Sequence, residues 1–300
     1  MHKASALMLA LLTTITLTFQ SIAYAKDVQK VRFPPMQSAD DVTHSYFVSL
    51  LSASLAATEE EYGKAEVEVL PTAYDQRLIL SLLNHQGILD VVASAPTAER
   101  ERRFRSTRVP LLMGLLSYRM FLIREDKLET FQQITKTDQL QKLTACSAEY
   151  WPGTQVLTQA QFKVRVAANF QQMFDLLLAG ECDYFPRGIT EGYGELHAFN
   201  EHNPELSGQL IAFDKVLLRY PLAVMFYTSH DNFELAGRIE KGLRQLQQTG
   251  DILKLLKKHS SSARAFPLSQ WQDSQVFELS NPVMPKVVPT DNAALWLTLP

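Results

Sequence analysis

Two arginines stand just beyond predicted buried strands, where a guanidinium can contact a ligand. The apolar run 87–95 leads through a polar turn to Arg100, and the short run 182–185 leads through a second turn to Arg187. Ligands of open α/β sheets bind outside the carboxyl ends of the strands. Two such positions on one chain predict two lobes that face each other across a cleft.

Each arginine also has an interpretation without a ligand. Arg100 opens the basic run 100–105, which is typical of a solvated surface. Arg187 lies four residues before Glu191, a spacing at which the two side chains can form an ion pair. The sequence leaves both alternatives open.

Four further side chains are candidate ligand contacts. Thr97 offers a hydroxyl near Arg100, and Ser147 follows a predicted strand near a possible helix N-terminus, which favours an anion. Tyr118 and Trp151 lie near predicted lobe edges. The alternatives are that Thr97 caps the following helical turn and that the aromatic rings pack a hinge or a core.

The only two cysteines, Cys146 and Cys182, form a candidate disulfide. Both fall in predicted strands of the same lobe, and a lone pair in an oxidising compartment is often bonded. Two buried free thiols are an equal alternative. A catalytic cysteine is disfavoured because no histidine is near either one in the sequence.

The N-terminus predicts export. A basic start at Lys3 precedes the mostly apolar stretch 4–22, and Ala23-Tyr24-Ala25 has the small-residue pattern of signal-peptide cleavage. A membrane anchor is the weaker alternative, because several threonines interrupt the stretch and a cleavage motif follows it. No later stretch is apolar for long enough to span a bilayer, so we expect a soluble periplasmic protein.

The charge balance argues against binding to nucleic acid. The formal net charge is −3, and loss of residues 1–25 removes Lys3 and no acid, which makes it −4. A protein that binds nucleic acid without sequence preference needs a basic face.

Strands alternate with helices along the chain, which predicts βαβ units and a mainly parallel sheet. The expected strands are 28–33, 65–70, 88–93, 115–124, 142–146, 162–167, 182–185 and 222–228. The expected helices are 42–57, 74–84, 127–140, 153–160, 170–178, 232–248 and 252–259. The proline-containing tail 277–300 is expected to wrap the surface as extended chain.

In their order and spacing, these pieces resemble the type 2 periplasmic solute-binding proteins, close to the family 3 group that includes binders of polar amino acids. The pieces are the strand with its T-x-x-R turn at 87–100, the apolar crossing at 109–119, the helix, glycine and aspartate strand at 173–183, and the closing helices at 235–259. Trp151-Pro152, the stretch 183–191 and the tail with Trp296 are similar to an uncharacterised subgroup.

The resemblance implies an α/β fold of two Rossmann-like lobes joined by two hinge strands. Residues 1–25 would be the signal peptide, 26–116 together with 222–300 would form lobe 1, and 117–221 would form lobe 2. In the family, ligand binding favours closure of the cleft.

The resemblance also implies roles for the two arginines. Arg100 matches the family arginine that clamps the ligand's carboxylate with its planar fork. Family members that bind amino acids carry an acid shortly after the aspartate strand to hold the ligand's ammonium group, whereas this chain has Arg187 there. Two cations in the cleft would favour an anion such as a dicarboxylate over a free α-amino acid.

We therefore expect a monomeric protein that captures a small polar, anionic solute and presents it to an ABC permease. The alternative is a signalling module that docks on a membrane sensor. The sequence lacks H-E-x-x-H, G-x-S-x-G and P-loop motifs, and its histidines show no metal spacing. We accordingly expect neither catalysis nor a metal or other cofactor.

Overall fold

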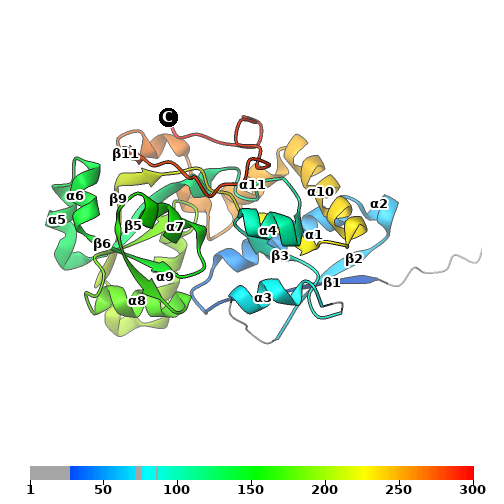
Figure 1. The fold of residues 1–300 in the computed structure, drawn as a ribbon, viewed down its shortest axis with the longest axis horizontal. Coiled ribbons are helices and arrows are strands. Elements are labelled where there is room, and N and C mark those ends of the chain that lie inside the picture. The colour runs from blue at the N-terminus through cyan, green and yellow to red at the C-terminus, as the bar shows by residue number, and fades with distance from the viewer. Residues whose placement is uncertain (1–27, 72–75, 86) are drawn as a thin grey trace, which may run out of the picture.

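The computed structural model describes residues 28–71, 76–85 and 87–300, which fold into two α/β lobes (Figure 1). The expected signal peptide at 1–25 lies outside the described residues. Lobe 1 holds the strands β1 (Gln29–Phe33), β2 (Ala65–Val69), β3 (Val92–Ser94), β4 (Phe104–Ser106) and β10 (Met225–Ser229). Its helices are α1 (Thr43–Ala56), α2 (Glu59–Tyr62), α3 (Gln76–Leu82), α4 (Ala98–Arg103), α10 (Phe233–Gln248) and α11 (Asp251–Lys258).

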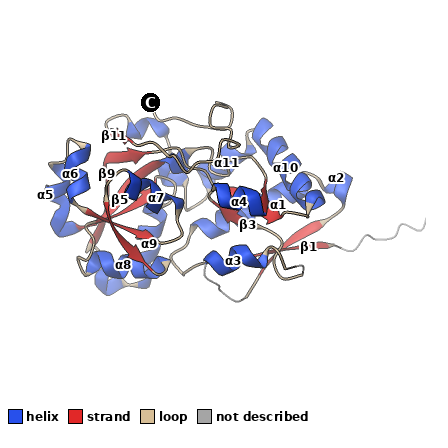
Figure 2. Ribbon diagram, viewed as in Figure 1, coloured by secondary structure: helices blue, strands red, loops and turns tan. Residues whose placement is uncertain are grey.

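Lobe 2 is built on one larger sheet (Figure 2). Its strands are β5 (Tyr118–Arg124), β6 (Thr144–Ala148), β7 (Lys163–Ala167), β8 (Tyr184–Gly188), β9 (Leu210–Arg219) and β11 (Gln275–Glu278). Its helices are α5 (Leu128–Gln132), α6 (Thr137–Lys142), α7 (Pro152–Gln159), α8 (Phe170–Leu178) and α9 (Gly192–His202). The single helix expected at 127–140 is therefore two short helices.

The described strands form three sheets, two in lobe 1 and one in lobe 2, and antiparallel pairs occur in both lobes, so the expectation of a mainly parallel sheet is wrong. In lobe 1, β1 and β2 are parallel, but β10 lies antiparallel between β3 and β4. In lobe 2 the order is β11-β9-β5-β8-β6-β7, and β5 runs antiparallel to both of its neighbours. The physical reason is that β5 and β10 enter their sheets from the connections between the lobes and not from a βαβ unit.

Two adjacent chain segments connect the lobes, as expected. The N–H of Leu111 donates to the carbonyl of Val224 at 2.9 Å, and the N–H of Tyr220 donates to the carbonyl of Ser117 at 3.1 Å. The Ser117 hydroxyl also accepts from the N–H of Leu222 at 3.1 Å. These bonds hold the two crossing segments together between the lobes.

The C-terminal segment adds a further connection, which the sequence did not predict. After α11 the chain reaches lobe 2, where β11 pairs in parallel with β9. It then returns, and Val288 packs in an apolar cluster of lobe 1. The placement of the whole of 222–300 in lobe 1 is therefore wrong for β11, whose four residues with one buried side chain carry a weak strand signal. Figure 1 shows this segment in orange and red.

Local signals explain the lobe 2 elements nearest the cleft. The Asn169 side chain caps α8 by accepting from the N–H of Gln172 at 2.9 Å, and Gly180, with φ +71°, follows the helix. A disulfide joins Cys146 of β6 to Cys182, with Cα atoms 5.5 Å apart, inside the buried core of this lobe. Within the described residues, no helix combines the length and apolar character needed to cross a membrane.

Candidate functional site

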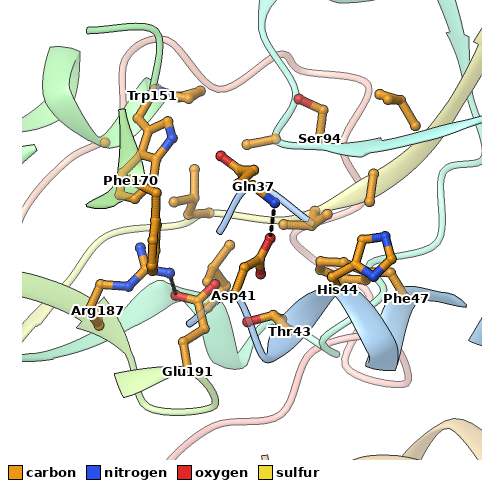
Figure 3. Close-up of a pocket in the computed structure, with 18 of the residues that line it drawn as sticks. Gln37, Asp41, Thr43, His44, Phe47, Ser94, Trp151, Phe170, Arg187 and Glu191 are labelled. Atoms are coloured by element: carbon orange, nitrogen blue, oxygen red, sulfur yellow. Dashed lines mark hydrogen bonds and ion pairs between the residues drawn. The ribbon is translucent and has the colours of Figure 1, made fainter. Parts of the chain in front are cut away.

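A cavity of about 170 Å³ lies where the two lobes and their crossing segments meet. Lobe 1 lines it from β1, the following loop, α1, α3 and β3; lobe 2 lines it from β6, α7, α8 and β8. The crossing segments contribute Leu116, Arg119 and Tyr220. Figure 3 shows the polar and aromatic side chains that converge on this space. Both lobes therefore contact whatever occupies the cavity.

Aromatic rings form much of the cavity wall. Trp151 stands directly before α7, whose first residue is Pro152, and its ring stacks on Phe185 with centroids 6.2 Å apart. Phe170, the first residue of α8, packs beside both rings. Phe33 and Phe47 line the cavity from lobe 1. This arrangement provides an apolar surface suited to a hydrocarbon or aromatic group.

Arg187 lines the cavity and is paired with two acids. Its Nε and one terminal nitrogen each donate to a Glu195 oxygen at 2.6 Å, and the same nitrogen lies 3.2 Å from Glu191. The guanidinium also lies 4.9 Å from the centre of the Trp151 ring. Glu195 has no exposed side-chain surface, and the Arg187 side chain is only 7% exposed. The expected ion pair with Glu191 is present, but Glu195 is the closer partner.

Glu191 links this pair to a second buried arginine. Its Oε2 accepts from Arg119 at 3.2 Å and from the N–H of Gly188 at 2.9 Å. A Cβ atom at position 188 would lie only 2.8 Å from that oxygen, so glycine is what lets the carboxylate fold back on the strand. Arg119 comes from β5 and Glu191 from the turn before α9, so the ion pair ties a crossing strand to lobe 2.

Burial and mutual repulsion perturb the acids of this cluster. Burial would raise the pKa of Glu191, but Arg187 and Arg119 hold it below its ordinary value. Burial raises the pKa of Glu195 to about 7 despite the Arg187 ion pair, and Glu191 and Asp41 push it in the same direction. Burial also raises the pKa of Asp41.

The loop after β1 supplies the polar groups of lobe 1. Asp41 Oδ2 accepts from the N–H of Gln37 at 3.2 Å (Figure 3). His44 bonds through Nε2 to the carbonyl of Pro34 at 2.7 Å. The hydroxyls of Thr43 and Ser94 are buried and have no hydrogen-bond partner among the described residues. Unpartnered buried hydroxyls that line a cavity are available to a ligand.

Arg100 and Thr97 lie outside this cavity and line a separate surface groove. The Arg100 guanidinium donates to the carbonyl of Ala95 at 2.5 Å and to that of Tyr150 at 3.2 Å, a bond that joins lobe 1 to lobe 2. The Thr97 hydroxyl accepts from the N–H of Arg100 at 3.1 Å and so caps α4. Thr97 therefore caps a helix, which was the alternative to a ligand contact. Burial lowers the pKa of Arg100.

The other four sequence candidates divide between cavity and hinge. Arg187, Trp151 and Ser147 line the cavity, although the Ser147 hydroxyl already pairs with Thr154 at 2.6 Å. Tyr118 does not line it: its hydroxyl accepts from the N–H of Leu299 at 3.2 Å, and its ring lies 5.3 Å from the Arg219 guanidinium. Across the described residues, no group of three or more His, Cys, Asp or Glu is arranged to hold a metal ion.

Sequence reasoning missed the lobe 1 half of the site. Gln37, Asp41 and Thr43 follow the first strand. The rule that ligands bind beyond the carboxyl ends of strands, which singled out Arg100 and Arg187, therefore applies to them as well. Arg119 was hidden because it sits inside an apolar strand, and its partner Glu191 is 72 residues away. Glu195 gave no signal, because only the fold of α9 turns it toward Arg187.

No protein-family model matches the sequence, and no curated protein matches it. Solved structures do match. An ancestral arginine-binding protein bound to arginine is 18% identical with a TM-score of 0.54, covering 77% of this chain and 97% of its own. The GluR0 ligand-binding core from Nostoc punctiforme, in complex with L-glutamate, is 15% identical with a TM-score of 0.52, covering 77% and 98%.

The chain has the bilobal fold of the type 2 periplasmic binding proteins. A periplasmic His/Glu/Gln/Arg/opine family-binding protein from Silicibacter pomeroyi, in complex with lysine, shares this fold at 12% identity, with a TM-score of 0.53 and coverage of 77% of this chain and 97% of its own. Each of these neighbours is matched over almost its full length, whereas nearly a quarter of this chain has no counterpart in them.

Proposed function

We propose that this protein is a periplasmic solute-binding protein that captures a small molecule between its lobes. The cavity itself carries the proposal, because its walls come from both lobes and from the crossing segments. A ligand that contacts both lobes stabilises the closed arrangement through interactions that an open arrangement lacks. Such a protein reports ligand occupancy through its shape.

The proposed role is delivery of the solute to an ABC importer. One solved neighbour with this fold is the substrate-binding protein of an amino acid ABC transporter, which supports that role. Another is the ligand-binding core of GluR0, so a sensing role on a membrane partner is the second candidate. Both roles use the same cavity, and both are consistent with the secretory signal peptide expected from the sequence.

The geometry removes the reason for preferring an anionic solute. That preference required two cations free to converge on the ligand. Arg187 is paired with Glu195 and Glu191, and Arg100 is bonded to two backbone carbonyls outside the cavity. The proposal of solute capture therefore stands without an assigned negative charge on the solute.

A ligand screen on the purified protein tests the proposal. A solute that binds only the folded state raises the melting temperature, and a hundredfold excess over its dissociation constant adds about 2.7 kcal/mol of stability. Amines, amino acids, organic acids and sugars form the panel, and calorimetry measures the affinity of each hit.

Two matched variants locate the binding site. Ser94→Phe fills the cavity from β3 and should abolish the shift, whereas Ser49→Phe, on an exposed position of α1, should preserve it. A shift that survives Ser94→Phe would place the ligand elsewhere. No shift with any compound would contradict solute capture.

A further inference from the structure

We infer that the solute is a small amphipathic amine without a carboxylate, with its cationic group held at Asp41 and its apolar body against the aromatic wall. This inference rests on the proposed solute-binding function. It differs from capture of an α-amino acid, which needs receptors for both an ammonium and a carboxylate group.

When all three acids are ionised, the arginines and acids around the cavity leave one negative charge uncompensated. Arg119 and Arg187 supply two positive charges, while Asp41, Glu191 and Glu195 supply three negative charges when ionised. The five groups form one cluster: Glu191 contacts both arginines, Glu195 contacts Arg187, and Asp41 interacts electrostatically with Arg187 and Glu195. A buried surplus charge is costly unless it is paired. A ligand cation removes the surplus, and a ligand anion increases it.

Asp41 is the acid of this cluster that remains available to a ligand. Glu191 and Glu195 are occupied by arginines, whereas Asp41 contacts no cation closely enough for an ion pair in the described structure and accepts one hydrogen bond, from the N–H of Gln37. His44 on α1, Arg187 on β8 and Glu191 are the ionisable groups that interact electrostatically with Asp41. Figure 3 shows Asp41 central among the labelled side chains.

Two unpartnered hydroxyls of lobe 1 also line the cavity. Thr43 is 4% exposed and Ser94 is 3% exposed; both line the cavity, and neither hydroxyl has a partner within the described residues. An ammonium group has three donors to distribute among acceptors. Figure 3 shows the Thr43 side chain beside Asp41 and Ser94 farther away, beyond Gln37, so Asp41 and Thr43 are the acceptors assigned to the ammonium group.

Both arginines of the cavity already bind the protein's own acids. Arg187 directs its Nε and one terminal nitrogen to Glu195, which is the bidentate geometry a ligand carboxylate would need. Arg119 donates from one terminal nitrogen to Glu191, and its buried Nε has no partner among the described residues. Arg100 bonds the carbonyls of Ala95 and Tyr150 away from the cavity. A ligand carboxylate would therefore compete with the protein's own acids for these guanidinium groups and would add to their negative charge.

The cavity's size and walls define the rest of the molecule. An apolar cavity of about 150 Å³ admits benzene, and the cavity here measures about 170 Å³. Trp151 and Phe170 on one side and Phe33 and Phe47 on the other suit one ring or a short branched chain. The ligand's cationic group would therefore be joined to this apolar body by a short linker.

The test compares probes that share one apolar body and differ in charge. Calorimetry at pH 8 measures 2-phenylethylamine, phenylalanine and 3-phenylpropionate, and a second series uses isopentylamine, leucine and 4-methylpentanoate. We expect each amine to bind at least tenfold more tightly than its amino acid, with the carboxylate weakest. An amino acid or a carboxylate that binds as tightly as its amine overturns the inference.

Asp41→Asn keeps the acceptor for Gln37 and removes the charge. It should weaken the amines by roughly 10- to 100-fold, the cost of losing a charge-assisted hydrogen bond, and should reduce their preference over the carboxylates. Asp40→Asn is the matched control, because Asp40 does not line the cavity and bonds His202 at 2.7 Å. The control should leave the ratio of amine to carboxylate affinity unchanged. An unchanged ratio in Asp41→Asn overturns the assignment of Asp41.

Failure of this inference is distinguishable from failure of the proposed function. Tight binding of an acid, a sugar or an amino acid, lost in Ser94→Phe, would retain solute capture and refute the amine. The absence of binding by every compound in the broad panel would refute both.

Discussion

Substitution of Arg187 by methionine should destabilise the protein strongly, because it leaves Glu195 buried without its cation. Glu195 has no exposed side-chain surface and receives two hydrogen bonds of 2.6 Å from Arg187. Removing one member of a buried ion pair typically costs about 3–5 kcal/mol. Methionine fills much of the space of the arginine stem, so we attribute the loss to charge and expect about 4 kcal/mol at pH 8.

The cost should fall at lower pH. Burial already raises the pKa of Glu195 to about 7, and loss of Arg187 should raise it further. A carboxyl group whose pKa is raised on folding contributes stability that is complete below its unfolded pKa and is lost as the pH rises through the folded pKa. The variant keeps Glu195 protonated to higher pH than the parent does, so its deficit should be smaller by about 1 kcal/mol at pH 6 than at pH 8.

Urea unfolding followed by circular dichroism at both pH values measures these differences. The variant Arg187→Met/Glu195→Leu removes the charged pair together, leaves Glu191 with Arg119, and should recover at least half of the lost stability. A double variant as unstable as Arg187→Met, or a cost below about 1 kcal/mol for Arg187→Met at both pH values, would refute the account of a buried, uncompensated acid.

Three further outcomes follow from the same geometry. Arg100→Ala should weaken the binding of all three phenyl probes by a similar factor, because it removes a contact between the lobes. A loss of affinity confined to the probes with a carboxylate would instead show that Arg100 is the ligand clamp that the family resemblance implies. Gly114→Ala should lower the free energy of unfolding by about 2 kcal/mol or more, because position 114 has a φ of +75° and a Cβ there would collide with Trp296. Gly250→Ala is the control: position 250 has a similar φ of +74° but open space around it, so the loss should be only about 1 kcal/mol. Chemical denaturation measures both. The affinity for amines should rise between pH 6 and pH 8, because a bound cation favours the ionised form of Glu195, whose pKa is about 7. Glu195 should therefore release a proton on binding, which calorimetry in buffers of different ionisation enthalpy detects. An affinity that is constant or falls over this range would contradict the prediction.

Local sequence signals predicted most of the elements but not how the strands join. Helix α10 was expected at 232–248 and spans Phe233–Gln248, and α8 was found because its apolar spacing ends before Gly180. Strand β9 was missed, since Asp214 and Lys215 interrupt its apolar pattern. The antiparallel direction of β5 and β10 carries no local signal at all, because direction depends on the path of the chain between lobes.

The site shows the same division. Trp151 and Arg187 were found because each follows a predicted strand or precedes a predicted helix. The environment of Arg187 was not predictable in full: Glu191 is four residues away along the chain, but the closer partner Glu195 reaches it only through the turn at Gly188 and the start of α9. Arg100 matched the family spacing, yet its side chain is directed to the carbonyl of Tyr150 in the other lobe.

By itself, the sequence determined the alternation of strands and helices, the resemblance to a bilobal fold, and the residues at strand ends from which a site is built. Those features depend on short-range periodicity, turn residues and caps, which act within a few residues. The tertiary structure alone decided which charges are paired, which hydroxyls lack a partner among the described residues and which arginines line the cavity. Those outcomes depend on contacts between residues far apart in the chain, such as Arg119 with Glu191 and Arg100 with Tyr150, whose energies arise only when folding brings the partners together and excludes water.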